Sequence, residues 1–164
     1  MIKEFEYELG NAGWAQIKIL TESNFGVTFI FSYLSDPLND LIASLNKLLK
    51  NVTSVELVSF AQEPGEIFLV INKIDCERIQ LEIYYHNNLT FETDIKKIRQ
   101  NFSNEMKEED SLSNFSKLVY AAAERLYEKH GEIGYKNRWL EYDFPINHYQ
   151  ELETLLKSYY LKNE

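Results

Sequence analysis

Short runs of alternating apolar and polar residues dominate the start of the chain. They lie at residues 5–9, 14–21 and 27–33, and short turn sequences such as Gly10-Asn11 separate them. An alternation with period two places successive side chains on opposite faces of a strand. The turns are too short for the crossover that a parallel pair needs, so the pattern predicts an antiparallel meander of three strands.

The period changes to that of a helix after residue 36. Asp36 suits the N-cap position, and Pro37 suits the first helical position, where a missing N–H costs nothing. The pattern predicts a helix over residues 37–50 with its apolar stripe against the sheet. The stripe consists of Leu38, Leu41, Ile42, Leu45, Leu48 and Leu49.

Alternation returns in the middle of the chain. The strands predicted there are residues 55–61, 67–73 and 79–85, with 89–94 as an optional seventh strand of the chain. The Glu63-Pro64-Gly65-Glu66 sequence predicts a type II turn, because Pro presets φ and Gly accepts a positive φ. Residues 95–106 match helical spacing only in part, and the charged run at 105–110 is typical of a solvated loop.

Helical spacing is clear again towards the end of the chain. It predicts a helix over residues 115–130, closed by Gly131, and another over 145–161. The sequence therefore predicts a single α+β domain over residues 1–164. Its fold class is a mainly antiparallel sheet of six or seven strands, with one helix after the third strand and two or three C-terminal helices. The expected core consists of Phe29, Phe31, Leu41, Leu45, Leu48, Leu69, Leu81, Ile83, Leu118 and Val119.

The charge balance narrows the range of partners. The chain carries 26 acidic and 17 basic residues, a net charge of −9. Acidity disfavours nucleic acid and anionic membranes as partners, because binding to both depends on neutralising phosphate groups. The charge fits a basic protein partner, and it also fits a simple need for solubility.

Location and redox state follow from two further features. No run approaches the roughly 20 apolar residues of a membrane span, and the first ten residues lack an apolar signal core. The single cysteine, Cys76, has no second cysteine to pair with, which fits a reducing compartment. We expect a cytoplasmic protein.

Catalytic and metal-binding signatures are weak. The three histidines have no ligand spacing, and neither a glycine-rich phosphate loop nor a nucleophile elbow occurs. We therefore predict no catalytic residue, no metal and no cofactor. Glu63 and Glu66 form a weak candidate carboxylate pair that would bind a cation or act in acid–base chemistry. The alternative is a hairpin with solvated charged shoulders.

The segment at residues 131–139 joins two predicted helices. Tyr135, Arg138 and Trp139 belong to residue types that are enriched at interface hot spots, so they are candidate protein-binding residues. In the alternative interpretation, Tyr135 and Trp139 pack beneath the last helix and Arg138 pairs with a carboxylate.

Several short motifs together suggest a family resemblance. They are Trp14, Ser32-Tyr33-Leu34-Ser35-Asp36 leading into a helix, Glu63-Pro64-Gly65-Glu66, and Gly134-Tyr135-Lys136-Asn137-Arg138-Trp139. In this order they resemble a widespread family of small uncharacterised bacterial proteins, over most of the chain. The resemblance implies a bacterial origin and a single α+β domain, and it implies no catalytic residue.

The leading functional hypothesis is a non-catalytic bacterial protein-binding module. One concrete form is a toxin-neutralising immunity-type protein, whose acidity would suit a basic nuclease. The alternative is a small hydrolase or small-ligand carrier with a site assembled from residues remote in sequence. A third possibility is a subunit whose exposed strand completes a homo-oligomeric sheet. The oligomeric state stays open.

Overall fold

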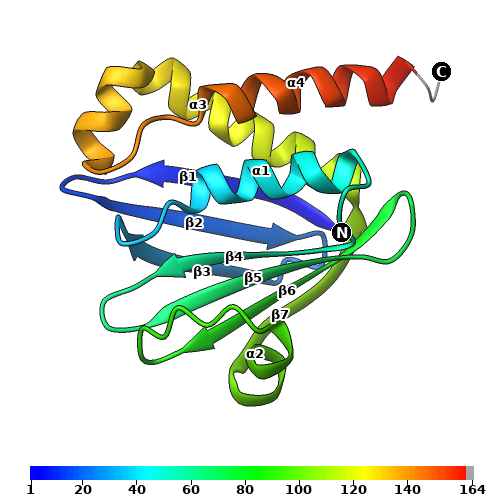
Figure 1. Cartoon of the computed structure of the whole chain (residues 1–164), viewed down its shortest axis with the longest axis horizontal. Helices are drawn as coiled ribbons and strands as arrows, with labels where there is room; N and C mark the ends of the chain where they lie inside the picture. Colours follow the sequence, from blue (N-terminus) through cyan, green and yellow to red (C-terminus); the bar gives the residue numbers. More distant parts are fainter. Residues whose placement is uncertain (162–164) are drawn as a thin grey trace.

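The computed structural model describes the backbone of residues 1–161 and the side chains of residues 1–159. Residues 162–164 of the predicted domain lie outside this described part. The helices are α1 (Pro37–Leu49), α2 (Ile95–Asn101), α3 (Leu112–Trp139) and α4 (Ile146–Leu161). Helices α1, α3 and α4 lie on one side of the molecule and α2 on the other (Figure 1).

Seven strands within residues 1–161 form two antiparallel sheets. Sheet A has the order β1 (Ile2–Leu9), β2 (Trp14–Thr21), β3 (Gly26–Ser32). Sheet B has the order β4 (Val55–Ala61), β5 (Glu66–Lys73), β6 (Arg78–His86), β7 (Ser103–Ser111). The predicted α+β class and antiparallel pairing are confirmed.

The strands divide into two sheets because α1 connects β3 to β4. These two strands do not pair through their backbones, and side chains join them instead. The Ser32 hydroxyl group donates to the carbonyl of Ala61 at 3.4 Å, and Gln62 Nε2 donates to the carbonyl of Ile30 at 2.7 Å.

One large core joins both sheets to α1, α3 and α4. Helix α1 buries all of its apolar stripe except Leu49, which is half-buried, and Leu38, Leu41, Leu45 and Leu48 have no exposed surface. Nine of the ten predicted core residues are buried. The exception, Leu118, is only half-buried because it lies on the side of α3 that faces β1.

A smaller core lies between the opposite face of sheet B and α2. Phe68, Val70, Tyr84 and Ile98 are buried there, and Phe102 stacks on Phe68 with ring centroids 5.3 Å apart. Sheet B is therefore covered on both faces near β5. This explains the nearly continuous run of apolar residues in that strand.

The predicted loop at residues 105–110 was wrong, because this segment belongs to β7. Its inward positions are Met106 and Asp110, both buried. The Asp110 carboxylate accepts the backbone N–H of Ile2 at 3.1 Å, and the Asn114 side chain donates to it at 2.9 Å. At the inward position of Asp110, a hydrogen bond to a residue distant in sequence thus takes the place of the apolar side chain that usually marks a strand.

The optional strand at residues 89–94 does not form. That segment is held instead by the buried Glu66 carboxylate, which accepts the backbone N–H groups of Thr90 and Phe91 at 2.8 and 2.9 Å. The predicted type II turn was also wrong. Gly65 does not adopt a positive φ, and the Glu63–Pro64 peptide bond is cis.

Helical geometry is interrupted at Gly131, where the sequence predicts the end of a helix. This glycine has a φ of 62° and a ψ of −177°, so α3 consists of two helical segments that meet at a kink. Residues 132–139 form the second, shorter segment. No helix in the described residues is both long enough and apolar enough to cross a membrane.

We predict that Leu45→Ala lowers the free energy of unfolding by about 2–5 kcal/mol, because it leaves a cavity in the main core. Urea unfolding measures the change. The matched control is Leu34→Ala, since Leu34 is 40% exposed and should change stability by less than about 0.5 kcal/mol. An equally small loss for Leu45→Ala would show that the stripe of α1 is not buried.

Candidate functional site

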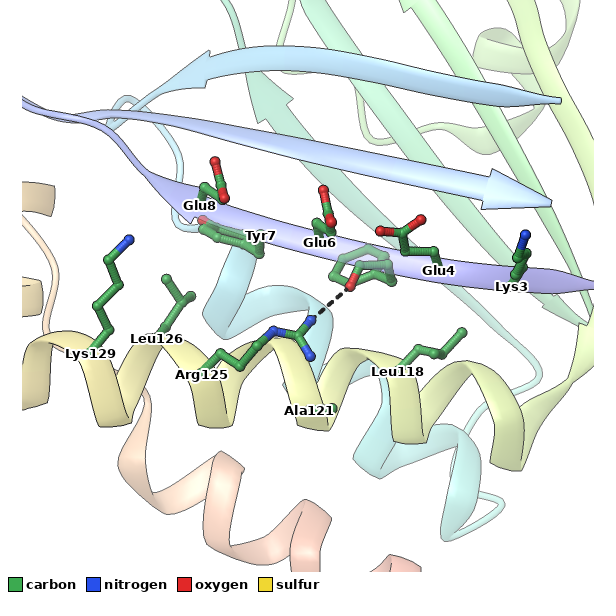
Figure 2. Close-up of a pocket in the computed structure, with 11 residues that line it drawn as sticks. Lys3, Glu4, Glu6, Tyr7, Glu8, Leu118, Ala121, Arg125, Leu126 and Lys129 are labelled. Carbon is green, nitrogen blue, oxygen red and sulfur yellow. Dashed lines mark hydrogen bonds between the residues drawn. The ribbon is translucent and has the colours of Figure 1, made fainter. Parts of the chain in front are cut away.

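The outer face of sheet A is uncovered by any described element. Alternation turns Phe5 and Tyr7 of β1 into the core, so Glu4, Glu6 and Glu8 point outward. In Figure 2 these three side chains project to the side of β1 away from α3. Successive carboxylates in such a row are about 7 Å apart.

One lysine partly neutralises the row. Lys18 of β2 lies 3.3 Å from a carboxylate oxygen of Glu4 and 3.5 Å from one of Glu6. A hydrogen bond shared with Glu4 raises the pKa of the Glu6 carboxyl group. Glu8 has no ion-pair partner in the part of the chain that the structure describes. The face therefore keeps a negative excess.

An exposed apolar patch adjoins the carboxylates. Trp14 is 37% exposed and Ile30 is 54% exposed, and both lie on the outer face at the Glu8 end of sheet A. Gln16 follows Trp14 by two positions on β2, and it lies opposite Glu8 of β1 on one side and Ile30 of β3 on the other. These side chains line a shallow pocket of about 240 Å³.

A groove of about 410 Å³ borders β1 on its free edge, where α3 forms the opposite wall (Figure 2). Leu118, Ala121 and Leu126 supply the apolar part of this wall, and Lys129 lies at one end. The guanidinium group of Arg125 crosses the groove and donates to the carbonyl of Phe5 at 3.2 Å. Arg125 thus covers part of the edge of β1.

A cleft of about 550 Å³ borders the other side of sheet A, between β3 and sheet B. Phe29, Ile67 and Ile83 are buried residues of its lining. Tyr85, 38% exposed, and the exposed Glu105 also line it.

The structure places the three predicted hot-spot residues at a junction inside the fold. Tyr135 and Trp139 are completely buried, and the Trp139 ring packs edge-on against Phe31 with centroids 5.8 Å apart. Both aromatic side chains are therefore part of the core, as the alternative interpretation expected, although Trp139 packs on β3. Only Arg138 stays partly exposed. It donates to the carbonyl of Gly10 at 3.1 Å and to Asn11 Oδ1 at 2.8 Å, in the turn between β1 and β2.

Gly13 explains why this junction is so tight. It has a φ of 77°, its N–H donates to the carbonyl of Arg138 at 2.8 Å, and its carbonyl accepts the N–H of Tyr33 at 2.8 Å. An added Cβ would meet the Tyr33 ring at 2.3 Å. The turn before Trp14, the segment before α1 and the end of α3 thus meet at one glycine.

Asp36 occupies the N-cap position of α1 without a side-chain capping bond. Its Oδ1 atom is buried without a hydrogen bond, as are the polar atoms of Tyr7, Tyr135 and Trp139. Burial raises the pKa of the Asp36 carboxyl group to about 7, and the negative charge of Asp40 adds to this. Burial also raises the pKa of Tyr135, and the Asp36 charge contributes.

The weak carboxylate pair is divided between surface and interior. Glu63 is exposed, whereas Glu66 is fully buried. The Glu66 carboxylate accepts bonds from Ser59, Thr90 and Phe91, so it fastens the segment after β6 to β5.

Two other chemical groups can be placed. Cys76 is exposed in the turn between β5 and β6. Residues 1–161 contain no group of three or more His, Cys, Asp or Glu side chains able to hold a metal ion.

The sequence marks the three glutamates as outward positions but does not show that their face is uncovered. Glu4, Glu6 and Glu8 alternate with apolar residues, a pattern that predicts a strand and nothing more. Trp14 and Ile30 occur in similar runs. Only the positions of the helices, all away from the outer face of sheet A, single these residues out. Comparisons of the chain with protein-family models, with curated proteins and with solved structures gave no match.

The buried carboxyl group predicts a pH-dependent stability. The folded pKa of Asp36 lies above the ordinary value of 3.8, so the folded chain binds this proton more tightly than the unfolded chain. The contribution to stability is complete below about pH 4 and is lost as the pH rises through about 7. We expect a loss of about 1–2 kcal/mol, less than full burial would give, because the carboxyl group keeps partial access to solvent.

Urea unfolding at about pH 5 and about pH 8 measures this loss. Asp36→Asn cannot ionise and should lose most of the difference between the two pH values. Asp143→Asn is the control, because the Asp143 side chain is 83% exposed, and it should keep most of the difference. An unchanged pH dependence in Asp36→Asn would contradict the assignment.

The junction predicts losses of stability of different size for two neighbouring residues. Trp139→Ala should lower the free energy of unfolding by about 3–5 kcal/mol, because it empties a core position. Arg138→Ala should cost only about 0.5–1.5 kcal/mol, the usual worth of exposed hydrogen bonds. Denaturant unfolding with circular dichroism compares them, and a stable Trp139→Ala would place the ring outside the core.

Proposed function

We propose that the protein is a non-catalytic protein-binding module that binds a basic protein through the outer face of sheet A. The observation that carries the proposal is the uncovered row of Glu4, Glu6 and Glu8 beside exposed Trp14 and Ile30. The negative charge of the row favours a partner with a positively charged surface. The apolar patch provides an area of contact from which water can be excluded.

The carboxylates favour a partner with several spaced cations. Three of them follow one strand, and Lys18 pairs with only two. Lysine or arginine side chains at matching spacing would find unneutralised acceptors. Charge complementarity of this kind mainly speeds association and excludes wrongly charged partners. The net charge of −9 acts in the same direction at longer range.

The patch supplies the short-range energy. Trp is among the side chains that dominate measured interface energies, and such anchors act best when neighbouring contacts exclude water. Trp14 is already part of a rigid strand, so it loses little conformational freedom on binding. Gln16, beside Trp14 and opposite Ile30, offers a polar contact that fixes the orientation of the partner.

A bacterial immunity-type protein is the concrete form that we favour. Nucleases bind an acidic polymer and therefore carry basic surfaces, which an acidic face would cover. A cytoplasmic location agrees with this role, since such a toxin must be neutralised where its nucleic acid substrate lies.

Neutralising the row tests the proposal. Immobilised wild type captures partners from a lysate of the native cell, and a captured protein is then purified for binding kinetics. We expect the Glu4→Gln, Glu6→Gln, Glu8→Gln triple variant to slow association with a basic partner about tenfold or more. The wild-type rate should also fall as salt rises from about 50 mM to about 500 mM.

The matched control is the triple variant Glu77→Gln, Glu128→Gln, Glu141→Gln. It makes the same change in charge at exposed positions outside sheet A. It should bind the same partner nearly as fast as wild type. Equal slowing in both triple variants would mean that net charge alone acts, and the proposed face would be wrong.

A further inference from the structure

The free edges of the two sheets are not protected equally. An edge strand presents unpaired N–H and C=O groups, and proteins usually protect such edges with charges, proline or a covering element. In residues 1–161 the strands at the sheet edges are β1, β3, β4 and β7.

Three of these edges carry clear protection. Strand β7 contains Lys107, Glu108 and Glu109, which discourage pairing. Strand β1 carries glutamates and lies against α3, with Arg125 bound to its edge. Strand β4 contacts α1, and its Glu56 accepts hydrogen bonds from that helix.

Strand β3 is less protected than these three, because Gln62 covers its Ile30 carbonyl but the strand carries no charge of its own. Its sequence, residues 26–32, contains no charged residue and no proline. Gly26, Thr28 and Ile30 are exposed. An uncharged, exposed edge strand favours aggregation unless another strand pairs with it. A partner strand would therefore explain why the edge of β3 carries no charge.

The direction of the backbone groups follows from two hydrogen bonds. The carbonyl of Ile30 accepts from Gln62, so it points away from β2. The N–H of Tyr33 donates to Gly13, so it points towards the β2 side. Because backbone groups alternate along an antiparallel strand, the N–H and C=O of Thr28 point away from β2, as does the N–H of Ile30.

These groups lie beside the cleft between β3 and sheet B, which measures about 550 Å³. A strand placed there would send alternate side chains towards Phe29, Ile67 and Ile83. The side chains between them would continue the outer face of sheet A. Glu105 lines the same cleft and would meet one of the entering side chains.

We infer that an extended segment of the protein partner binds in this cleft as an added strand on the free edge of β3. The segment alternates apolar side chains, which enter the cleft, with basic or polar side chains, one of which meets Glu105. This inference rests on the proposed function and adds that the partner contains an extended segment. Backbone hydrogen bonds supply affinity in such strand addition, and the side chains supply specificity.

A second copy of this chain does not suit the position. The free edge of β3 faces a cleft that sheet B closes on the other side. A folded copy would bring its own sheet B along the same edge of its β3, and the two copies would collide. A single extended segment has no such neighbours.

The test uses synthetic peptides and wild-type protein labelled with 15N. One peptide of about seven residues alternates valine with lysine and threonine, the length of a typical strand. A second has the same composition in scrambled order, and a third is N-methylated on the amides that would face β3. Chemical shifts give the binding site, and amide exchange reports pairing.

We expect the alternating peptide to shift resonances around the cleft. It should slow exchange of the Thr28 and Ile30 amides about tenfold or more, because pairing protects them. The N-methylated peptide should not slow these amides, since it cannot form the bonds. Binding at the groove between β1 and α3, or equal effects of all three peptides, would overturn the inference.

Two protein variants examine the same contact. Thr28→Pro removes an outward N–H that no strand uses, and should weaken peptide binding about tenfold. Thr28→Val keeps the N–H and should bind like wild type. Glu105→Lys should weaken the lysine-containing peptide, whereas Glu109→Lys, with the same charge change on β7, should not.

Two further results separate this inference from the proposed function. If a captured partner loses affinity with the glutamate triple variant but binds Thr28→Pro like wild type, the strand addition is wrong and the proposed face stands. If sedimentation equilibrium shows a dimer that Thr28→Pro dissociates, a second copy occupies the edge, and the inference fails.

Discussion

Helix α1 buries nearly all of its apolar stripe in a core that both sheets share, and the orientation of the strands depends on this burial. Leu38, Leu41 and Leu45 have no exposed surface. A strand that contributes to this core must turn every second side chain inward. Once Phe5 and Tyr7 point towards the core, the glutamates between them can only point to solvent. The acidic face is thus a geometric consequence of core packing, whatever its use.

The two sheets share this core but differ in their surroundings. Sheet B has α2 on its second face, where Phe68, Val70 and Ile98 are buried. Sheet A has no such cover among residues 1–161, and its outer side chains are half-buried or exposed. Sheet B is thus covered on both faces and sheet A on one face. The uncovered face of sheet A is the open side of the molecule. Any partner that recognises a sheet surface must approach from the open side.

Periodic segments were predictable, and segments fixed by distant polar contacts were not. Six strands and the helix after β3 follow from apolar spacing alone. Strand β7 escaped prediction because its inward Asp110 binds the backbone of Ile2, which is more than a hundred positions away. Glu66 anchors Thr90 and Phe91 in the same manner. At the candidate site, alternation marked the glutamates as outward, but only the tertiary arrangement leaves their face uncovered. The burial of Trp139 likewise depends on the bend at Gly131 and the close contact at Gly13.

The single cysteine has a practical value that its chemistry alone does not suggest. Cys76 is exposed in the turn after β5, whereas the cleft lies near the start of that strand, at Ile67. Nine residues separate these positions, which corresponds to about 25–30 Å of extended chain. A thiol-coupled fluorophore or surface linker at Cys76 would therefore sit well away from the cleft. The protein can be attached to a sensor through this thiol at a distance from the cleft, with no engineered residue.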